Sequence, residues 1–275
     1  MNDLEAPAIE EILSHDISFG SESLSISVSK LHVEFRGLDA GLLTTGSALF
    51  RNFLRPDSPS PVDALILETV STDRTQFLST ESVRPLVDPP FRTVRDAGRL
   101  LFWSHDFACL VDEETRRGRL VLCKTEPDVY AMNLSNCVRL LFAFNAVEYG
   151  SFLLHAAGLA LRDKVHVFFG TSGAGKSTVA SLSTDTLLLG DDQVLISPHR
   201  GDVSGEGTPF MGGERLHAML HGGTAPNENL RLPVAGFYRL IKSESVAIVP
   251  LSMTEAIPAL LSVTSFLSEP SFGIK

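Results

Sequence analysis

Cysteine is scarce in this chain of 275 residues. The three cysteines, Cys109, Cys123 and Cys137, lie far apart, are odd in number and form no CxxC pair. We therefore expect no disulfide framework, and the pattern is typical of buried free thiols in a reducing compartment. Long apolar runs are also missing. No stretch of about eighteen apolar residues occurs, so we expect no membrane-spanning segment.

Clustered positive charge is missing as well. The chain holds 23 Lys and Arg against 33 Asp and Glu, which gives a net charge of −10, and no run of basic residues stands out. Nucleic acids and anionic membranes bind clustered Lys and Arg, so neither is an expected partner. The N-terminal stretch MNDLEAPAIEEILSHD is acidic and lacks the basic-then-apolar order of a signal peptide. These features predict a cytoplasmic protein.

Material for a packed core is plentiful, because 44% of the residues are hydrophobic and 20% are charged. The length fits one large α/β domain, or a small domain joined to a medium one. Residues 22–36 alternate with one slip of phase, which predicts two short strands or one bulged strand. Residues 107–111 and 119–123 flank a charged turn and predict a hairpin. We therefore expect residues 1–130 to form a β-rich region of unknown role.

The character of the sequence changes after residue 130, where we place a domain boundary. Residues 134–149 have apolar side chains at helical spacing, and Asn133 or Ser135 can cap the start of the helix. Two apolar runs follow, at residues 152–161 and 165–169, and predict paired strands of a buried sheet. Near the C-terminus, Ser252 and Glu255 form a capping box that predicts a helix over residues 256–266.

A glycine-rich loop follows the second of these strands directly. Its sequence, GTSGAGKS from Gly170 to Ser177, matches G-x-x-x-x-G-K-[ST] without exception, and a helix-compatible stretch comes next. Glycines let successive N–H groups face phosphates, Lys176 would reach the β- and γ-phosphates, and the Ser177 hydroxyl would ligate Mg²⁺. The residues expected to bind nucleotide are Gly170, Thr171, Ser172, Gly173, Ala174, Gly175, Lys176, Ser177 and Thr178.

A pair of aspartates, Asp191 and Asp192, lies between two apolar runs, and Asp192 is fifteen residues after Ser177. In an ATP site one carboxylate can hold the metal shell, and the other can accept a proton from an attacking hydroxyl. Gly-Asp-Asp is also an ordinary hairpin turn. Only about two turns of helix fit between the loop and the next strand. This short interval argues against the ordinary P-loop switches and motors.

The loop, the acidic pair and a preceding histidine together resemble the catalytic domain of HPr kinase/phosphorylase. The similar stretch is LLHAAGLALRDKVHVFFGTSGAGKSTVASL…LLGDDQVLI. In the bacterial enzyme a His-Gly lies fifteen residues before the first glycine of the loop, and His155 lies fifteen residues before Gly170. The resemblance covers residues 150–260 and does not reach the first 130 residues.

This resemblance implies the fold shared with ATP-dependent phosphoenolpyruvate carboxykinase, an α/β P-loop domain with a mixed sheet at residues 131–275. It implies ATP and Mg²⁺ as cofactors, Asp192 as proton acceptor, Asp191 in the metal shell, and His155 as an active-site residue. A histidine at the end of an apolar strand is otherwise usually structural.

Two family features lack a clear counterpart. The metal-binding glutamate of an LExRGLG segment is missing, and Glu214 in GTPFMGGERL is the nearest substitute by position. The later catalytic arginine has no clear match, and Arg231 is one candidate. The chain is thus similar to a divergent branch with variable N-terminal regions, whose known members phosphorylate peptide hydroxyls. Bacterial relatives are oligomers, and such domains commonly continue past the equivalent of Lys275, so the resemblance implies a homo-oligomer and a C-terminally truncated domain.

Three functions compete at this stage. The first is a Mg²⁺-ATP-dependent kinase acting on a Ser or Thr hydroxyl of a protein or peptide, with phosphorylase activity implied only by the resemblance. The second is a nucleotide-binding regulatory or scaffold module without turnover. The third is a carboxykinase-type enzyme, for which no arginine-rich carboxylate site is found. His217 and His221 share a helical face, but no third zinc ligand is evident, so we expect packing or solvent-facing histidines.

Overall fold

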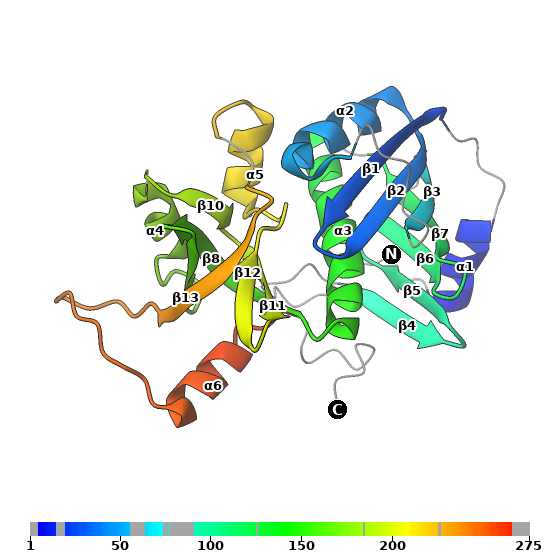
Figure 1. The fold of residues 1–275 in the computed structure, drawn as a ribbon. Helices are drawn as coiled ribbons and strands as arrows, with labels where there is room; N and C mark the ends of the chain where they lie inside the picture. The colour runs from blue at the N-terminus through cyan, green and yellow to red at the C-terminus, as the bar shows by residue number, and fades with distance from the viewer. Residues whose placement is uncertain are drawn as a thin grey trace. The chain divides into compact units, whose positions relative to one another are not determined.

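The chain forms two units, each built around its own sheet (Figure 1). The units are Met1–Leu141 and Phe142–Lys275. The dividing point lies within helix α3 (Pro127–Glu148), and the boundary expected near residue 130 lies in the same helix. This computed structural model describes residues 5–14, 20–55, 64–73, 77, 91–124, 126–183, 185–224 and 227–265. Among these residues, no helix is long and apolar enough to cross a membrane.

The first unit holds a seven-stranded sheet in the order β1-β2-β3-β7-β6-β5-β4. Residues 22–36 form two strands, as one of the two expectations had it, and Ser29 takes a φ of 53° in the turn between them. The hairpin predicted within residues 107–123 is confirmed. The strand bounds are β1 (Glu22–Val28), β2 (Leu31–Leu38), β3 (Leu65–Thr72), β4 (Arg92–Asp96), β5 (Arg99–Trp103), β6 (Phe107–Asp112) and β7 (Arg117–Cys123).

Helices of the first unit pack on this sheet, which is mixed because β3 runs parallel to both β2 and β7. Helix α1 (Ala6–Ser14) buries Ile9 and Leu13 against a cluster that includes Trp103. Helix α2 (Ala40–Leu49) is capped by Asp39, and a 3-10 turn, η1 (Arg51–Phe53), follows it. The three cysteines are buried free thiols, as expected. Most of the surface loop predicted over residues 52–62 lies outside the described residues.

The helix predicted over residues 134–149 exists, but its predicted start is wrong. It begins at Pro127, so Asn133 and Ser135 are buried helical residues and not caps. Proline is favoured at the first helical position because that residue has no intrahelical partner for an N–H, and Asp128 in the first turn suits the helix dipole. The helical spacing of apolar residues therefore marked residues 134–149 and missed the first two turns of the helix.

The second unit holds a six-stranded sheet in the order β10-β8-β11-β12-β13-β9, with β8 also paired to β9. The strands β8, β11, β12, β13 and β9 therefore close into a ring. Antiparallel pairs dominate, but β13 and β9 are parallel, so the sheet is mixed as predicted. The strand bounds are β8 (Phe152–Leu161), β9 (Lys164–Phe169), β10 (Leu187–Gly190), β11 (Gln193–His199), β12 (Asp202–Glu206) and β13 (Arg231–Arg239).

Three further helices belong to the second unit: α4 (Lys176–Leu182), α5 (Gly213–Leu220) and α6 (Met253–Leu261). With them the described residues hold six α-helices, and the chain is of mixed α/β class. Helix α4 follows the glycine loop and has two turns, as its interval predicted. The capping box of Ser252 and Glu255 is confirmed, although α6 begins and ends earlier than predicted.

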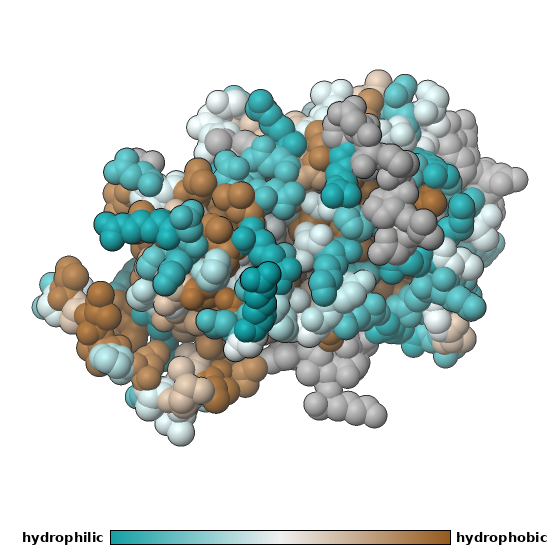
Figure 2. Space-filling model, in the orientation of Figure 1, coloured by the Kyte–Doolittle hydropathy of each residue, from teal (hydrophilic) through white to brown (hydrophobic). Residues whose placement is uncertain are grey.

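A segment of the second unit that carries several large apolar side chains lies on the surface. Residues 241–250 are exposed throughout, between the end of β13 and α6. Figure 2 shows the brown side chains that gather over this segment and over α6. The exposed large apolar residues of this region are Ile241, Val246, Ile248, Val249, Leu251, Met253, Ile257 and Leu261.

Strand β8 offers a direct test of where the core of the second unit lies. Leu154 is fully buried among Val167, Val194 and other apolar side chains, whereas Leu161 at the end of the same strand is 43% exposed. We expect Leu154→Ala to lower the free energy of unfolding by about 2–5 kcal/mol, and Leu161→Ala by less than about 1 kcal/mol. Equilibrium urea unfolding measures both, and equal losses would contradict the assigned core.

Candidate functional site

Strand β8 carries one predicted site residue and lies between the segments that carry the others. The loop emerges from β9, whose last residue, Phe169, pairs with Ala156 on β8. Strand β10 also pairs with residues 158–160 of β8, so β9 and β10 must take opposite edges. The Ala156 N–H donates to the carbonyl of Asp192 at 3.1 Å. The loop and the acidic pair therefore flank the same position of β8, next to His155.

The glycine loop adopts a tight backbone path before α4. Gly173 has a φ of 75°, and Gly175, the residue that precedes α4, has a φ of 110°, which side chains rarely tolerate. Four hydroxyl-bearing residues of this segment are exposed, namely Thr171, Ser172, Ser177 and Thr178. The start of a helix and its free N–H groups attract anions, so the loop has the shape and polarity that phosphate requires.

Lys176 is the charged residue of the loop, and it is buried. Its Nζ donates to the Gly170 carbonyl at 3.0 Å and faces the Thr171 carbonyl at 3.5 Å. Burial lowers the pKa of Lys176, and the charge of Asp192 raises it. The ammonium group thus lies inside the curve of the loop, within electrostatic reach of the acidic pair.

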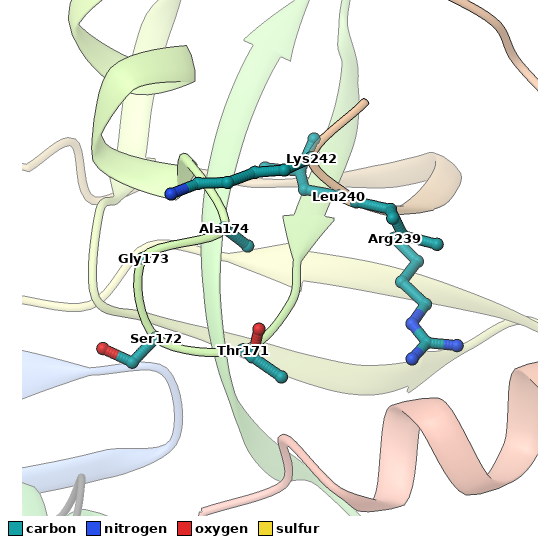
Figure 3. Close-up of a pocket in the computed structure, with 8 residues that line it drawn as sticks. Thr171, Ser172, Gly173, Ala174, Arg239, Leu240 and Lys242 are labelled. Atoms are coloured by element: carbon teal, nitrogen blue, oxygen red, sulfur yellow. The ribbon is translucent and has the colours of Figure 1, made fainter. Parts of the chain in front are cut away.

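A pocket of about 370 Å³ opens beside the loop (Figure 3). The parallel pairing of β13 with β9 builds its second wall, because the Leu240 N–H donates to the Phe169 carbonyl at 2.7 Å. Two cations, Arg239 and Lys242, lie on this wall. In the close-up the amino group of Lys242 extends on the Ala174 side of the loop, and the guanidinium of Arg239 on the Thr171 side. The pocket is lined by Thr171, Ser172, Gly173, Ala174, Arg239, Leu240, Ile241 and Lys242.

These two cations were not predicted. Long-range parallel pairing leaves no mark in the sequence, and residue 239 is seventy positions from its partner, Phe169. The available signal was modest: two basic residues directly after an apolar strand.

Asp191 and Asp192 do not form the hairpin turn that was the alternative reading of Gly-Asp-Asp. Strands β10 and β11 both run antiparallel to β8 and keep the same register on either side of the two aspartates. The pair therefore interrupts one long strand, with a register shift beside it. Such interruptions are common next to active sites, where they redirect side chains.

Gly190 makes this interruption possible. A Cβ at this position would lie 2.1 Å from the carbonyl oxygen of Gln193, closer than any real contact. The Thr208 hydroxyl donates to the same carbonyl at 2.7 Å and holds the strand in place. The backbone on both sides of the aspartates is therefore constrained, and the acidic pair is held on a rigid element.

Asp191 is a buried carboxylate in a polar but incomplete environment. Its side chain is 5% exposed, and burial raises its pKa to about 6. Arg215 and the N–H of Gly212 lower that pKa, and the neighbouring Asp192 raises it. The Gly212 N–H donates to Oδ2 at 3.4 Å, while Oδ1 accepts no hydrogen bond from any described residue. Desolvation is therefore the main cause of the raised pKa, and repulsion between the two carboxylates is a smaller one.

Asp192 faces His155. The His155 Nδ1 lies 3.2 Å from the Asp192 Oδ1, although the two atoms are not aligned as a hydrogen bond. Both side chains are partly buried, at 19% and 15% exposure. The structure therefore brings together His155, Asp191, Asp192 and Lys176, four residues that the sequence analysis placed in one site.

Glu214 is not brought into this group. It is exposed in the first turn of α5. In the described part of the chain, its carboxylate does not join Asp191 and Asp192 in a set of ligand atoms mutually within 4.8 Å. The following residue, Arg215, turns toward the acidic pair instead, with its Nη1 3.8 Å from the Asp191 Oδ1.

Arg231, the predicted candidate for a catalytic arginine, has a different environment. Its Nε donates to the Ser204 hydroxyl at 3.0 Å and lies 3.4 Å from the Glu206 carboxylate, and its Nη2 donates to the Pro198 carbonyl. These contacts join β11, β12 and β13, which favours a structural role. His217 and His221 are exposed, with their ring centroids 4.4 Å apart.

Compared with known proteins, the chain matches no family model and no curated protein sequence.

Because the pKa of Asp191 is raised, we expect its ionised carboxylate to lower the stability of the folded protein. The folded state holds this proton more tightly than the unfolded chain, so stability falls as the pH rises from about 4 to 6. We expect Asp191→Asn to stabilise the protein at pH 7.5 by on the order of 2 kcal/mol, because asparagine mimics the neutral acid. The pKa of about 6 already includes the attraction of Arg215.

Thermal unfolding in EDTA measures this effect at pH 7.5 and at pH 3.5, where most of the advantage should be lost because the carboxyl is largely protonated in both states. Asp163→Asn, in the exposed β8–β9 turn, is the matched control and should change neither midpoint. A lower midpoint for Asp191→Asn at pH 7.5 would show that the ion pair outweighs desolvation.

Proposed function

We propose that the second unit binds Mg²⁺-ATP and transfers the γ-phosphate to a hydroxyl group, that of a Ser or Thr of a protein or peptide. One observation carries the proposal: the glycine loop and the acidic pair flank the same residues of β8, at His155 and Ala156. A phosphate-binding element and a carboxylate pair at one position are the two parts that phosphoryl transfer needs.

The loop supplies the phosphate-binding part. Its backbone N–H groups and the start of α4 would hold the phosphates, and Lys176 would exchange its bonds to the Gly170 and Thr171 carbonyls for phosphate oxygens. The pocket beside the loop has room for the rest of a nucleotide. Arg239 and Lys242 on its wall would add positive charge where an anionic ligand enters.

The acidic pair suits a divalent cation. Asp191 Oδ1 is buried and accepts no hydrogen bond among the described residues, so an oxygen ligand is available at low dielectric. Asp191 and the Ser177 hydroxyl would hold Mg²⁺, which prefers hard oxygen ligands and keeps several waters. When bound, the ion would neutralise charge on the transferring phosphate.

Asp192 and His155 would handle the proton of the acceptor hydroxyl. Asp192 lies 3.2 Å from His155 and close enough to Lys176 to affect its pKa. The carboxylate would accept the proton as the hydroxyl oxygen attacks, and the histidine would orient it. Loss of such a base usually costs a factor of about 10²–10⁴ in rate.

We also propose that this unit has the fold of the HPr kinase and phosphoenolpyruvate carboxykinase type. The mixed sheet, the two-turn helix after the loop and the acidic pair directly beyond it support this assignment. Glu214 is exposed and away from the pair, so the site would be a divergent example of this type.

Incubation of the protein with labelled ATP, Mg²⁺ and Ser- or Thr-containing peptides tests the proposed kinase activity. We expect Lys176→Ala to weaken ATP binding by about a hundredfold, because a buried charged hydrogen-bond donor to phosphate is lost. Asp192→Asn should keep ATP affinity within a few fold and lower label transfer by about 10²–10⁴. The controls are Asp163→Asn, in the exposed turn before β9, and Lys164→Ala, at the exposed first residue of β9, and both should behave as wild type.

A wild-type chain that fails to bind ATP would overturn the proposal. Tight ATP binding with no transfer to any peptide would instead support the second candidate, a nucleotide-binding module without turnover. The exposed position of Glu214 favours this candidate.

A further inference from the structure

Helix α6 carries apolar residues on more than the face that packs on the core. Its residues Ala259 and Leu260 contact the core of the second unit. Met253, Ile257 and Leu261 follow one another at intervals of four residues, so they share a different face of the helix, and they are 49–71% exposed. These three residues form the outer stripe of α6. Helices with apolar residues around most of their circumference are normally buried, so we expect another surface to cover this stripe.

The arm, residues 241–250, carries a second group of exposed apolar side chains. It leaves the end of β13 and stands away from the six-stranded sheet before α6 begins (Figure 1). Val246, Ile248 and Val249 are 74–105% exposed. Among the described residues, no backbone–backbone hydrogen bond joins the arm to another segment. Because β-branched residues favour strands, residues 246–249 have the composition of an edge strand that still lacks a partner strand.

The exposed area is large enough for a stable interface. The described residues 241–261 hold eight large apolar side chains that are 40–105% exposed, and Figure 2 shows them gathered on one side of the second unit. At roughly 100 Å² for each side chain, they offer on the order of 800 Å². The largest apolar patch of a monomer is typically about 300–600 Å², whereas each partner in a standard interface buries about 800 Å². The surface therefore has the size of one half of a protein–protein interface.

Charge favours a second copy of this chain as the partner. Residues 241–261 hold Lys242, Glu244 and Glu255 as their charged residues, a net charge of −1, whereas the whole chain has a net charge of −10. Two such acidic chains repel one another, and they do so least where the surface is nearly neutral. A membrane is a poorer partner, because helices that lie on membranes carry several Lys and Arg on their polar face.

We propose that residues 246–249 pair antiparallel with the same residues of a second copy, and that the outer stripe of α6 is buried in the resulting dimer. A twofold axis relates a segment to its own antiparallel copy, so such an interface is closed, and the same backbone groups are satisfied in both chains. The four residues are all apolar, so apolar side chains face one another across the pair. This inference does not depend on the proposed function, because it uses neither the glycine loop nor the acidic pair.

Sedimentation equilibrium of the nucleotide-free protein measures the association. At about 100 μM, the wild type should sediment with twice the mass of one chain. Ile248→Lys should raise the dissociation constant of the dimer by at least about a hundredfold, because each dimer would bury two unpaired ammonium groups. Leu182→Lys is the matched control: it makes the same kind of change at an apolar residue of α4 that is 76% exposed, and it should leave the constant unchanged.

The outer stripe and the backbone pairing are tested separately. Ile257→Lys should raise the constant by about tenfold or more, because it places a charge in the stripe. Successive residues of a strand direct their N–H groups to opposite edges, so Ala247→Pro and Ile248→Pro between them remove a donor from either edge. At least one proline variant should raise the constant by about tenfold, because a carbonyl of the partner loses its donor. The substituted side chains are exposed, so every variant should keep the wild-type circular dichroism spectrum, which shows that it folds.

A wild type that is monomeric at this concentration would overturn the inference, and so would open-ended polymers, because a twofold pair is closed. Dimers that persist in Ile248→Lys or in Ile257→Lys would exclude the arm or the stripe from the interface. If Ile248→Lys dissociates while both proline variants remain dimeric, the contact lacks strand pairing and the proposed pairing fails. The nucleotide-binding experiments are read independently, so neither proposal depends on the outcome of the other.

Discussion

The pairing of β8 along both of its edges is the constraint on which the candidate site depends. On one edge β9 delivers the glycine loop, and on the other the strand interrupted by Asp191 and Asp192 delivers two carboxylates. Hydrogen bonds of a sheet fix these positions to within a residue, because a slip by one would turn every side chain to the other face. The loop and the acidic pair are thereby held around residues 155 and 156.

The charges of the site are arranged at a cost to the fold. Burial raises the pKa of Asp191 and lowers that of Lys176 and Arg215, so each charge would be more favourable in water. Opposite charges offset part of this cost, and Lys176 satisfies its donors on the carbonyls of its own loop. A rigid, desolvated and polar cavity is the environment in which electrostatic stabilisation of a transition state is largest. The cost of these charges to stability and the proposed activity of the site therefore have one origin.

Local sequence signals were reliable where a single segment decides the outcome. The glycine motif, the short helix after it, the strands within residues 22–36 and the capping box at Ser252 each depend on neighbours in the chain, and the structure has all of them. Alternatives stayed open where local chemistry permits two structures. Gly-Asp-Asp suits a hairpin turn as well as an interrupted strand, and pairing with β8 decides between them. The helix begins earlier than its predicted start, and Pro127 at its first position is the local signal for that start.

Residue types and short spacings were enough to name Lys176, Ser177, Asp191 and Asp192 as one group, since phosphate and Mg²⁺ chemistry restricts which side chains can serve. The family resemblance added His155 to this group. The partners that complete the group come from distant segments: Arg215 from α5, and Arg239 and Lys242 from the end of β13. Their positions follow from the ring of strands and from parallel pairing across seventy residues, which folding alone establishes. The same contacts separate Glu214, which faces solvent, from its neighbour Arg215, because successive residues of a helix point in different directions.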